Sequence, residues 1–263
     1  MPAAFITGAS SGLGECFAYA LARRGFALVL VARRRERLQA VADRALELGA
    51  PRAEALPADL ARRDDLLKLA RRIEAAGPEL DYLVNSAGFG TAGPLARLAG
   101  ERELEQVDVN IAALVALTRT ALPAMVARRR GVIINLASTA AFQPIPYMAT
   151  YGATKAFVLS FSQAVAEEVA NAGVTVLALC PGPTPTEFQQ VAGSGRARFP
   201  SFVYSSADTV VEQGLKAAER GRVLCVVGAL NRAAVQAARF APRALVMMVE
   251  RRIFGPLALR RRA

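Results

Sequence analysis

The stretch Phe5-Ile6-Thr7-Gly8-Ala9-Ser10-Ser11-Gly12-Leu13-Gly14 decides the fold. An apolar run ends at Thr7, a turn of glycine and serine follows, and a helical pattern begins at Leu13. Glycine permits the tight turn at Gly8, lets the backbone come close to phosphate at Gly12, and allows helix and strand to pack at Gly14. A strand, such a turn and a helix bring backbone N–H groups to a pyrophosphate. We therefore expect nucleotide binding here, although a Gly/Ser turn also occurs without that function.

The rest of the chain repeats this alternation of short apolar runs and longer helical patterns. Runs that are nearly continuous in apolar residues are typical of parallel strands covered on both faces. We expect strands at Ala3–Thr7, Ala27–Ala32, Ala53–Pro57, Leu80–Val84, Val132–Ala137, Val174–Cys180 and Val223–Val227. We expect helices at Leu13–Arg24, Arg34–Leu48, Arg62–Ala75, Glu101–Arg129, Tyr151–Asn171 and Ala207–Arg220.

This alternation predicts the α/β class, as a single Rossmann-like, doubly wound domain with a seven-stranded parallel sheet and helices on both faces. We expect residues 1–228 to form the dinucleotide-binding and catalytic domain. Residues 229–263 then form a basic, amphipathic extension of the same domain, as a pocket cover, a subunit contact or a membrane-surface helix.

The composition excludes several kinds of chemistry. The 263 residues include no histidine, which removes a Ser–His triad and His-ligated zinc. The cysteines are odd in number and far apart, so neither a disulfide framework nor a metal site is expected. A net charge of +11 attracts anions, such as a phosphorylated cofactor or nucleic acid. No signal peptide and no run of ~18 apolar residues is visible, so we expect a cytoplasmic protein without a spanning helix.

Tyr151 and Lys155 lie one helical turn apart on a predicted helix, so their side chains share one face. A tyrosine with its ordinary pKa of about 10 is a poor acid–base group at neutral pH, and a neighbouring cation lowers that pKa. The pair therefore suggests acid–base chemistry. The alternative is a surface tyrosine packed on a lysine stem.

Further polar residues follow the predicted strands at the carboxyl edge, where open α/β sheets bind ligands. Ser138 follows the fifth strand, 85-Asn-Ser-Ala-Gly-88 the fourth, and Pro181-Gly182 the sixth. Together with the first turn, this set resembles the short-chain dehydrogenase/reductase family over essentially residues 3–227. The matching pieces are Thr7-Gly8-xxx-Gly12-x-Gly14, Asp59, Asn85-x-Ala87-Gly88, Asn110, Ser138, Tyr151-xxx-Lys155, Pro181-Gly182 and Thr186. Ser86 departs from the family's usual second asparagine.

The resemblance implies a role for each of these residues. Tyr151 exchanges a proton with the carbonyl oxygen, Lys155 lowers the pKa of Tyr151 and binds the nicotinamide ribose, Ser138 holds the substrate oxygen, and Asn110 positions a water. The catalytic residues are then Asn110, Ser138, Tyr151 and Lys155. The expected cofactor-binding residues are Gly8, Ser10, Ser11, Gly12, Leu13, Gly14, Arg33, Arg34, Asp59, Leu60, Asn85, Ala87, Gly88, Tyr151, Lys155, Pro181, Gly182, Thr184 and Thr186.

The end of the second strand bears on the choice of cofactor. Ala32 stands where NAD enzymes commonly carry an acid, and Arg33-Arg34-Arg35 follow it. With no neighbouring carboxylate to repel a 2′-phosphate, Arg33 and Arg34 can each bind one, and we expect NADP(H) to be preferred over NAD(H). A solvated first helical turn is the alternative interpretation.

The expected substrate is a small, apolar carbonyl compound or alcohol. Ser138, Phe142, Tyr147 and Phe188 would line its pocket, with Phe199 and Phe202 from a lid at Thr184–Ser206. The expected function is an NADP(H)-dependent oxidoreductase. A non-catalytic NADP-binding regulator and a nucleic-acid-binding protein stay open as alternatives, although we expect no nucleic-acid partner. The helices Glu101–Arg129 and Tyr151–Asn171 predict a homodimer or homotetramer.

Overall fold

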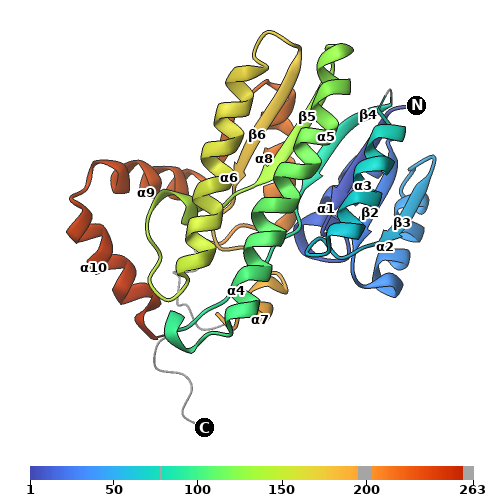
Figure 1. Cartoon of the computed structure of the whole chain (residues 1–263). Helices are drawn as coiled ribbons and strands as arrows, with labels where there is room; N and C mark the ends of the chain where they lie inside the picture. The colour runs from blue at the N-terminus through green and yellow to red at the C-terminus, as the bar shows by residue number, and fades with distance from the viewer. Residues whose placement is uncertain (78, 195–202, 257–263) are drawn as a thin grey trace.

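The computed structural model describes residues 1–77, 79–194 and 203–256. Within them, seven strands form one parallel sheet in the order β3-β2-β1-β4-β5-β6-β7 (Figure 1). The strands are β1 (Ala3–Thr7), β2 (Ala27–Ala32), β3 (Ala53–Pro57), β4 (Leu80–Asn85), β5 (Gly131–Leu136), β6 (Val174–Cys180) and β7 (Leu224–Val226). The predicted fold class is confirmed, and the predicted strand bounds differ by a single residue at each affected end. The order reverses beside β1, which places the first turn at the topological switch point.

Helices cover both faces of the sheet because its strands carry apolar side chains on both sides. Ala4 and Ile6 of β1 pack under α1 (Gly12–Ala22), α2 (Arg35–Glu47) and α8 (Ala207–Glu219). Phe5, which points to the other face, packs under α3 (Arg63–Ala75), α5 (Ala113–Ala127) and α6 (Ala149–Glu168). Two apolar layers therefore hold the carboxyl edge of the sheet rigidly in place.

The single helix predicted at Glu101–Arg129 is interrupted. It consists of α4 (Gly100–Val107), a π-helical turn at Asp108–Ala112, and α5. A π turn adds a residue to the helix and changes which side chains face the core, and it occurs frequently at functional sites. Here it contains the buried Asn110.

The continuous stretch Gly100–Ala127 is also long and apolar enough to cross a membrane, judged by length and composition alone. Its second half, α5, packs against α3 and β4. Such packing is that of a core helix.

The C-terminal segment adds α9 (Ala229–Phe240) and α10 (Arg243–Phe254) beside α6 (Figure 1). Asn231 at the start of α9 donates hydrogen bonds to the carbonyl oxygens of Val227 (2.9 Å) and Val203 (3.3 Å). Phe254, at the end of α10, packs in a cluster with Ile145 and Met148. The segment thus covers part of the domain, although Phe240 and Met248 on it are exposed.

Candidate active site

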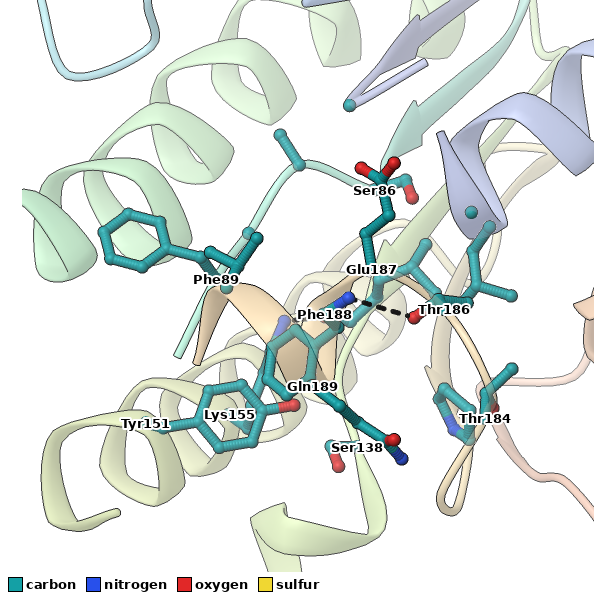
Figure 2. Close-up of a pocket in the computed structure, with 18 of the residues that line it drawn as sticks. Ser86, Phe89, Ser138, Tyr151, Lys155, Thr184, Thr186, Glu187, Phe188 and Gln189 are labelled. Carbon is teal, nitrogen blue, oxygen red and sulfur yellow. Dashed lines mark hydrogen bonds between the residues drawn. The ribbon is translucent and has the colours of Figure 1, made fainter. Parts of the chain in front are cut away.

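A cavity of about 460 Å³ lies at the carboxyl edge of the sheet, between the β1–α1 turn, the end of β5, the start of α6 and the end of α10. Its lining includes Ser10 and Arg34 as well as Ile253 and Phe254. Figure 2 shows the part around Tyr151, Lys155 and Ser138. Segments far apart in the chain therefore share one pocket.

Three side chains form what we call the catalytic wall: Ser138, Tyr151 and Lys155. Ser138 follows β5, where its Oγ accepts a hydrogen bond from the backbone N–H of Ala140 at 3.1 Å. Tyr151 and Lys155 lie one turn apart at the start of α6, as predicted. The Tyr151 hydroxyl points toward the Ser138 side of the pocket, with Lys155 beside the ring (Figure 2).

Lys155 is almost entirely withdrawn from solvent, with 6% of its surface exposed. Its Nζ donates a hydrogen bond to the Leu136 carbonyl oxygen at 2.6 Å and lies 5.8 Å from the centre of the Tyr151 ring. Desolvation lowers the pKa of Lys155 to about 8. The ammonium group is therefore held in place but only moderately favoured over the neutral amine.

Desolvation also raises the pKa of Tyr151 to about 12, and hydrogen bonding with Ser138 acts in the opposite direction. Ser138 is the group whose hydrogen bond lowers this pKa in the structure, and the Lys155 ammonium donates to the Leu136 carbonyl oxygen. The phenol is accordingly protonated throughout the physiological range, as a proton donor requires. That Lys155 lowers the pKa of Tyr151 during turnover stays a prediction.

Asn110 lies behind this wall. Its Nδ2 donates to the Phe89 carbonyl oxygen (2.9 Å) and to Thr154 Oγ1 (3.0 Å), and its Oδ1 accepts from the Phe89 N–H (3.1 Å). Asn110 thus joins the loop after β4 to α6. A Cβ atom on Gly88 would lie 2.9 Å from Asn110 Oδ1 and 3.5 Å from Lys155 Nζ, so Gly88 allows both to approach the same point. The water-positioning role of Asn110 stays a prediction.

The glycine turn has the form that the sequence predicts. Gly8 adopts φ +68°, and a Cβ atom there would lie 2.8 Å from Ala87 Cα. A Cβ atom on Gly14 would overlap the Gly8 carbonyl group. Ser11 occupies the N-cap of α1 without a side-chain capping bond, which leaves amides at this helix N-terminus for an anion. The turn fits the diphosphate of a dinucleotide.

Arg34 lies over this turn. Its Nη2 donates to Ser11 Oγ at 2.7 Å and to Ser10 Oγ at 3.2 Å. These contacts hold a guanidinium next to the place where the sequence predicts the adenosine end of the cofactor. Ala32 lines the same cavity and supplies no side-chain acceptor for a ribose hydroxyl.

Two carboxylates face these arginines, which corrects the expectation that none lies near them. Glu187 Oε2 accepts from Arg34 Nη1 at 2.7 Å, and its other oxygen accepts from Arg37. These hydrogen bonds lower the pKa of Glu187 to about 2. Glu105 accepts from Arg33 at 3.1 Å. We call these five residues the charged rim.

Other predicted cofactor residues divide into two groups. The cavity is lined, as expected, by Gly8, Ser10, Ser11, Gly12, Leu13, Gly14, Arg33, Arg34, Asp59, Leu60, Ala87, Gly88, Tyr151, Lys155, Pro181, Gly182, Thr184 and Thr186. Asn85 does not line it, because its side chain is buried and donates to Thr118 Oγ1 (3.1 Å) and Asn135 Oδ1 (2.8 Å). Asn85 thus stabilises the sheet beneath the pocket.

The predicted substrate residues also need correction. Phe188 lines the cavity, with its ring centre 5.1 Å from that of Tyr151. Phe142 turns away into an apolar cluster that includes Val235 of α9, and Tyr147 packs beside the cluster of Ile145 without lining the cavity. Phe199 and Phe202 lie outside the described residues.

Several polar residues that line the pocket were not predicted, and three of them bear on its chemistry. Glu187 and Gln143 lie in the loops after β6 and β5, and Glu250 enters from α10. Glu250 carried a usable signal, since it is the only acidic side chain after Glu219 in an arginine-rich segment. Among the residues that the structure describes, no group of three His, Cys, Asp or Glu side chains could hold a metal.

Comparisons with known proteins agree with this geometry. The family model for the short chain dehydrogenases matches residues 2–197. The 11-beta-hydroxysteroid dehydrogenase A of Sesamum indicum is 35% identical over 215 residues, 80% of this chain and 58% of that protein. The chain therefore spans less than two thirds of that relative's length.

Two solved structures extend the comparison. A short-chain dehydrogenase from Sphingobium yanoikuyae, in complex with NADPH, is 34% identical with a TM-score of 0.81, covering 94% of this chain and 96% of that one. The bulky-bulky ketone specific alcohol dehydrogenase from Comamonas testosteroni is 29% identical with a TM-score of 0.78, covering 94% of both chains. This chain belongs to the short-chain dehydrogenase/reductase family of oxidoreductases.

Proposed function

We propose that this protein is an NADP(H)-dependent oxidoreductase that interconverts an apolar ketone and its secondary alcohol. The observation that carries the proposal is that the catalytic wall, the glycine turn and Arg34 line one cavity. The neighbour from Sphingobium yanoikuyae was solved with NADPH, and the Comamonas testosteroni neighbour acts on bulky-bulky ketones, which supports both parts of the proposal.

A bound nicotinamide supplies the hydride to the carbonyl carbon in reduction and takes it back in oxidation. The protein's own contribution is the proton. Tyr151 donates its phenolic proton to the carbonyl oxygen, and in the reverse direction its phenolate accepts the proton of the alcohol. Ser138 donates a hydrogen bond to the same oxygen and so stabilises the charge that develops there.

Lys155 acts on the cofactor side of Tyr151. Its Nζ is fixed by the Leu136 carbonyl oxygen and lies close to Gly88, and both residues line the cavity together with the glycine turn. In this position the ammonium can hydrogen-bond a ribose hydroxyl and stabilise a Tyr151 phenolate. Asn110 keeps the loop and helix in register around it.

The preference for NADP(H) rests on Arg34. It is the arginine that lies directly over Ser10 and Ser11, whereas Arg33 is directed to Glu105 on α4. A guanidinium in this position binds a 2′-phosphate through charge-assisted hydrogen bonds. For this to occur, Glu187 must yield at least part of its contact with Arg34.

The apolar character of the substrate is supported by an apolar cluster in the cavity. Ile145, Met148, Phe188 and Phe254 form one cluster that borders the cavity beside Tyr151. A hydrocarbon body is favoured there by burial from water. A sugar would bring many hydroxyl groups against these apolar side chains.

The test is a panel of ketones and secondary alcohols, screened with NADPH and NADP while nicotinamide absorbance is followed, with Tyr151→Phe as the matched control. We expect turnover of apolar ketones by the unmodified protein and none above background by the variant. Tight NADPH binding with no turnover across the panel favours a non-catalytic regulator instead. Salt-sensitive binding of DNA or RNA without cofactor binding favours a nucleic-acid function.

A further inference from the structure

A polar pair lies inside the otherwise apolar part of the cavity. Glu250, on α10, is 7% exposed, and its Oε1 accepts a hydrogen bond from Gln143 Nε2 at 3.1 Å. Both side chains line the same cavity as Ser138 and Tyr151. The apolar residues Ile253 and Phe254 of α10, and Ile145 from the loop after β5, line the same cavity.

Two oxygens of this pair are buried without a partner. Within residues 1–77, 79–194 and 203–256, no group donates a hydrogen bond to Glu250 Oε2 or to Gln143 Oε1. A buried polar atom without a hydrogen bond is costly, so two such atoms on residues that line a cavity indicate a missing donor. The desolvation that raises the pKa of Glu250 acts on the same carboxyl group.

The chemistry of the two free atoms limits what can bind them. Both are acceptors, so they recognise an O–H or N–H group. A carboxylate, a phosphate or another carbonyl oxygen has no hydrogen to donate to these acceptors. An anion would also be repelled by Glu250. The pair therefore selects against acidic substrates in spite of the chain's net charge of +11.

Resting on the proposed oxidoreductase function, we propose that Gln143 and Glu250 form a substrate-recognition subsite. The substrate is a ketone or secondary alcohol whose apolar body carries a hydrogen-bond donor, a hydroxyl or an amino group, at a position remote from the reacting carbon. Tyr151 and Ser138 hold the reacting oxygen, and the Gln143–Glu250 pair holds the donor. Since Glu250 comes from α10, the C-terminal segment serves as a specificity element.

The experiment compares a graded series of methyl alkyl ketones whose far end is a methyl, a hydroxyl or an amino group. For at least one of the two donor-bearing ketones, hydroxyl or amino, we expect kcat/KM to be at least about tenfold higher than for the methyl-ended ketone of equal length. A site built for a donor leaves its acceptors unpaired when the donor is missing. The hydroxyl and amino arms identify which donor the site takes.

Glu250→Leu should lose this preference while it still reduces the methyl ketones. Gln143→Leu should reduce the preference in the same direction, and Met248→Leu, an exposed position on the same helix, should leave it unchanged. Equal kcat/KM for donor and methyl ketones in the unmodified protein would overturn the subsite while leaving the oxidoreductase function intact. No reduction of any ketone would instead count against the proposed function.

The Tm of the variants distinguishes a recognition role of the Gln143–Glu250 pair from a purely structural one. If Glu250 shared a proton with Gln143 and closed the pair on itself, Glu250→Leu would lower Tm and leave the donor preference intact. The proposal predicts the reverse: a Tm that is equal or higher, because a buried carboxyl without its ligand is removed, and a lost preference. Should Glu250→Leu fail to fold, Glu250→Gln and Gln143→Leu supply the same comparison.

Discussion

The catalytic wall lines one cavity together with Arg33, Arg34 and Glu187 of the charged rim, but the two groups are held in place by different forces. Lys155 is buried and hydrogen-bonded to the β5 backbone, and Ser138 caps a short 3-10 helix. Arg34 and Glu187 of the rim are each about 40% exposed at the side chain and contact one another through an ion pair. Exposed ion pairs contribute about 0–1 kcal/mol each, so the rim can exchange partners while the wall cannot. The comparison leads us to expect that turnover and cofactor choice are separable in this protein.

The largest effect should come from the wall. Tyr151→Phe removes the proton donor and leaves the ring in contact with Phe188, so we expect kcat for ketone reduction to fall by about 10²–10⁴-fold. Steady-state or single-turnover absorbance at saturating NADPH measures this. A variant that retains near-normal kcat would exclude Tyr151 as the donor.

The pH dependence of turnover tests the role of Lys155 in the catalytic wall. Lys155, with its pKa lowered from 10.5 to about 8, is cationic below that pH and neutral above it. Tyr151, at about 12, keeps its proton over the same range. We therefore expect kcat/KM for reduction to be level at neutral pH and to decline as pH rises through about 8.

Lys155→Arg is the matched control, because a guanidinium keeps its charge at every working pH. Whatever its absolute rate, its profile should lack the decline near pH 8. A profile of the unmodified protein that stays flat well above pH 8 would contradict the assignment.

These two predictions concern residues that the sequence located correctly. The sheet and the glycine turn follow from local patterns of apolar runs and glycine positions. The choice of Ser138, Tyr151 and Lys155 rested on their positions together with the resemblance to the family. The π turn at Asp108–Ala112 was missed because its residues continue the helical pattern. Glu187 and Arg34 are 153 residues apart, and no local pattern predicts such a contact. Phe142 is an apolar residue in a loop and could pack either into the pocket or into a neighbouring apolar cluster. The sequence alone could not decide between these, and the structure places it in the cluster with Val235.

On the rim, the largest expected effect is that of Arg34→Ala. The ratio of kcat/KM for NADPH over NADH should fall by about tenfold, because one charge-assisted pair with the 2′-phosphate is lost. NADH itself should be little affected. Arg33→Ala serves as the matched control, since Arg33 contacts Glu105 instead of the glycine turn, and its effect should be smaller.

The smallest effect tests the carboxylate of the rim. Glu187→Gln releases Arg34 and Arg37 from their anion, so NADPH should bind about two- to threefold more tightly at low salt, with the difference shrinking as salt is added. Glu105→Gln, which releases only Arg33, should change NADPH binding less. Weaker NADPH binding by Glu187→Gln would show that the carboxylate supports the pocket instead of competing with phosphate.

The most direct test of the separation between wall and rim is the dissociation constant of NADPH, measured by nicotinamide fluorescence without any substrate. We predict equal constants for the unmodified protein and Tyr151→Phe, and a constant about tenfold weaker for Arg34→Ala. Weakened binding in Tyr151→Phe together with unchanged binding in Arg34→Ala would contradict the account.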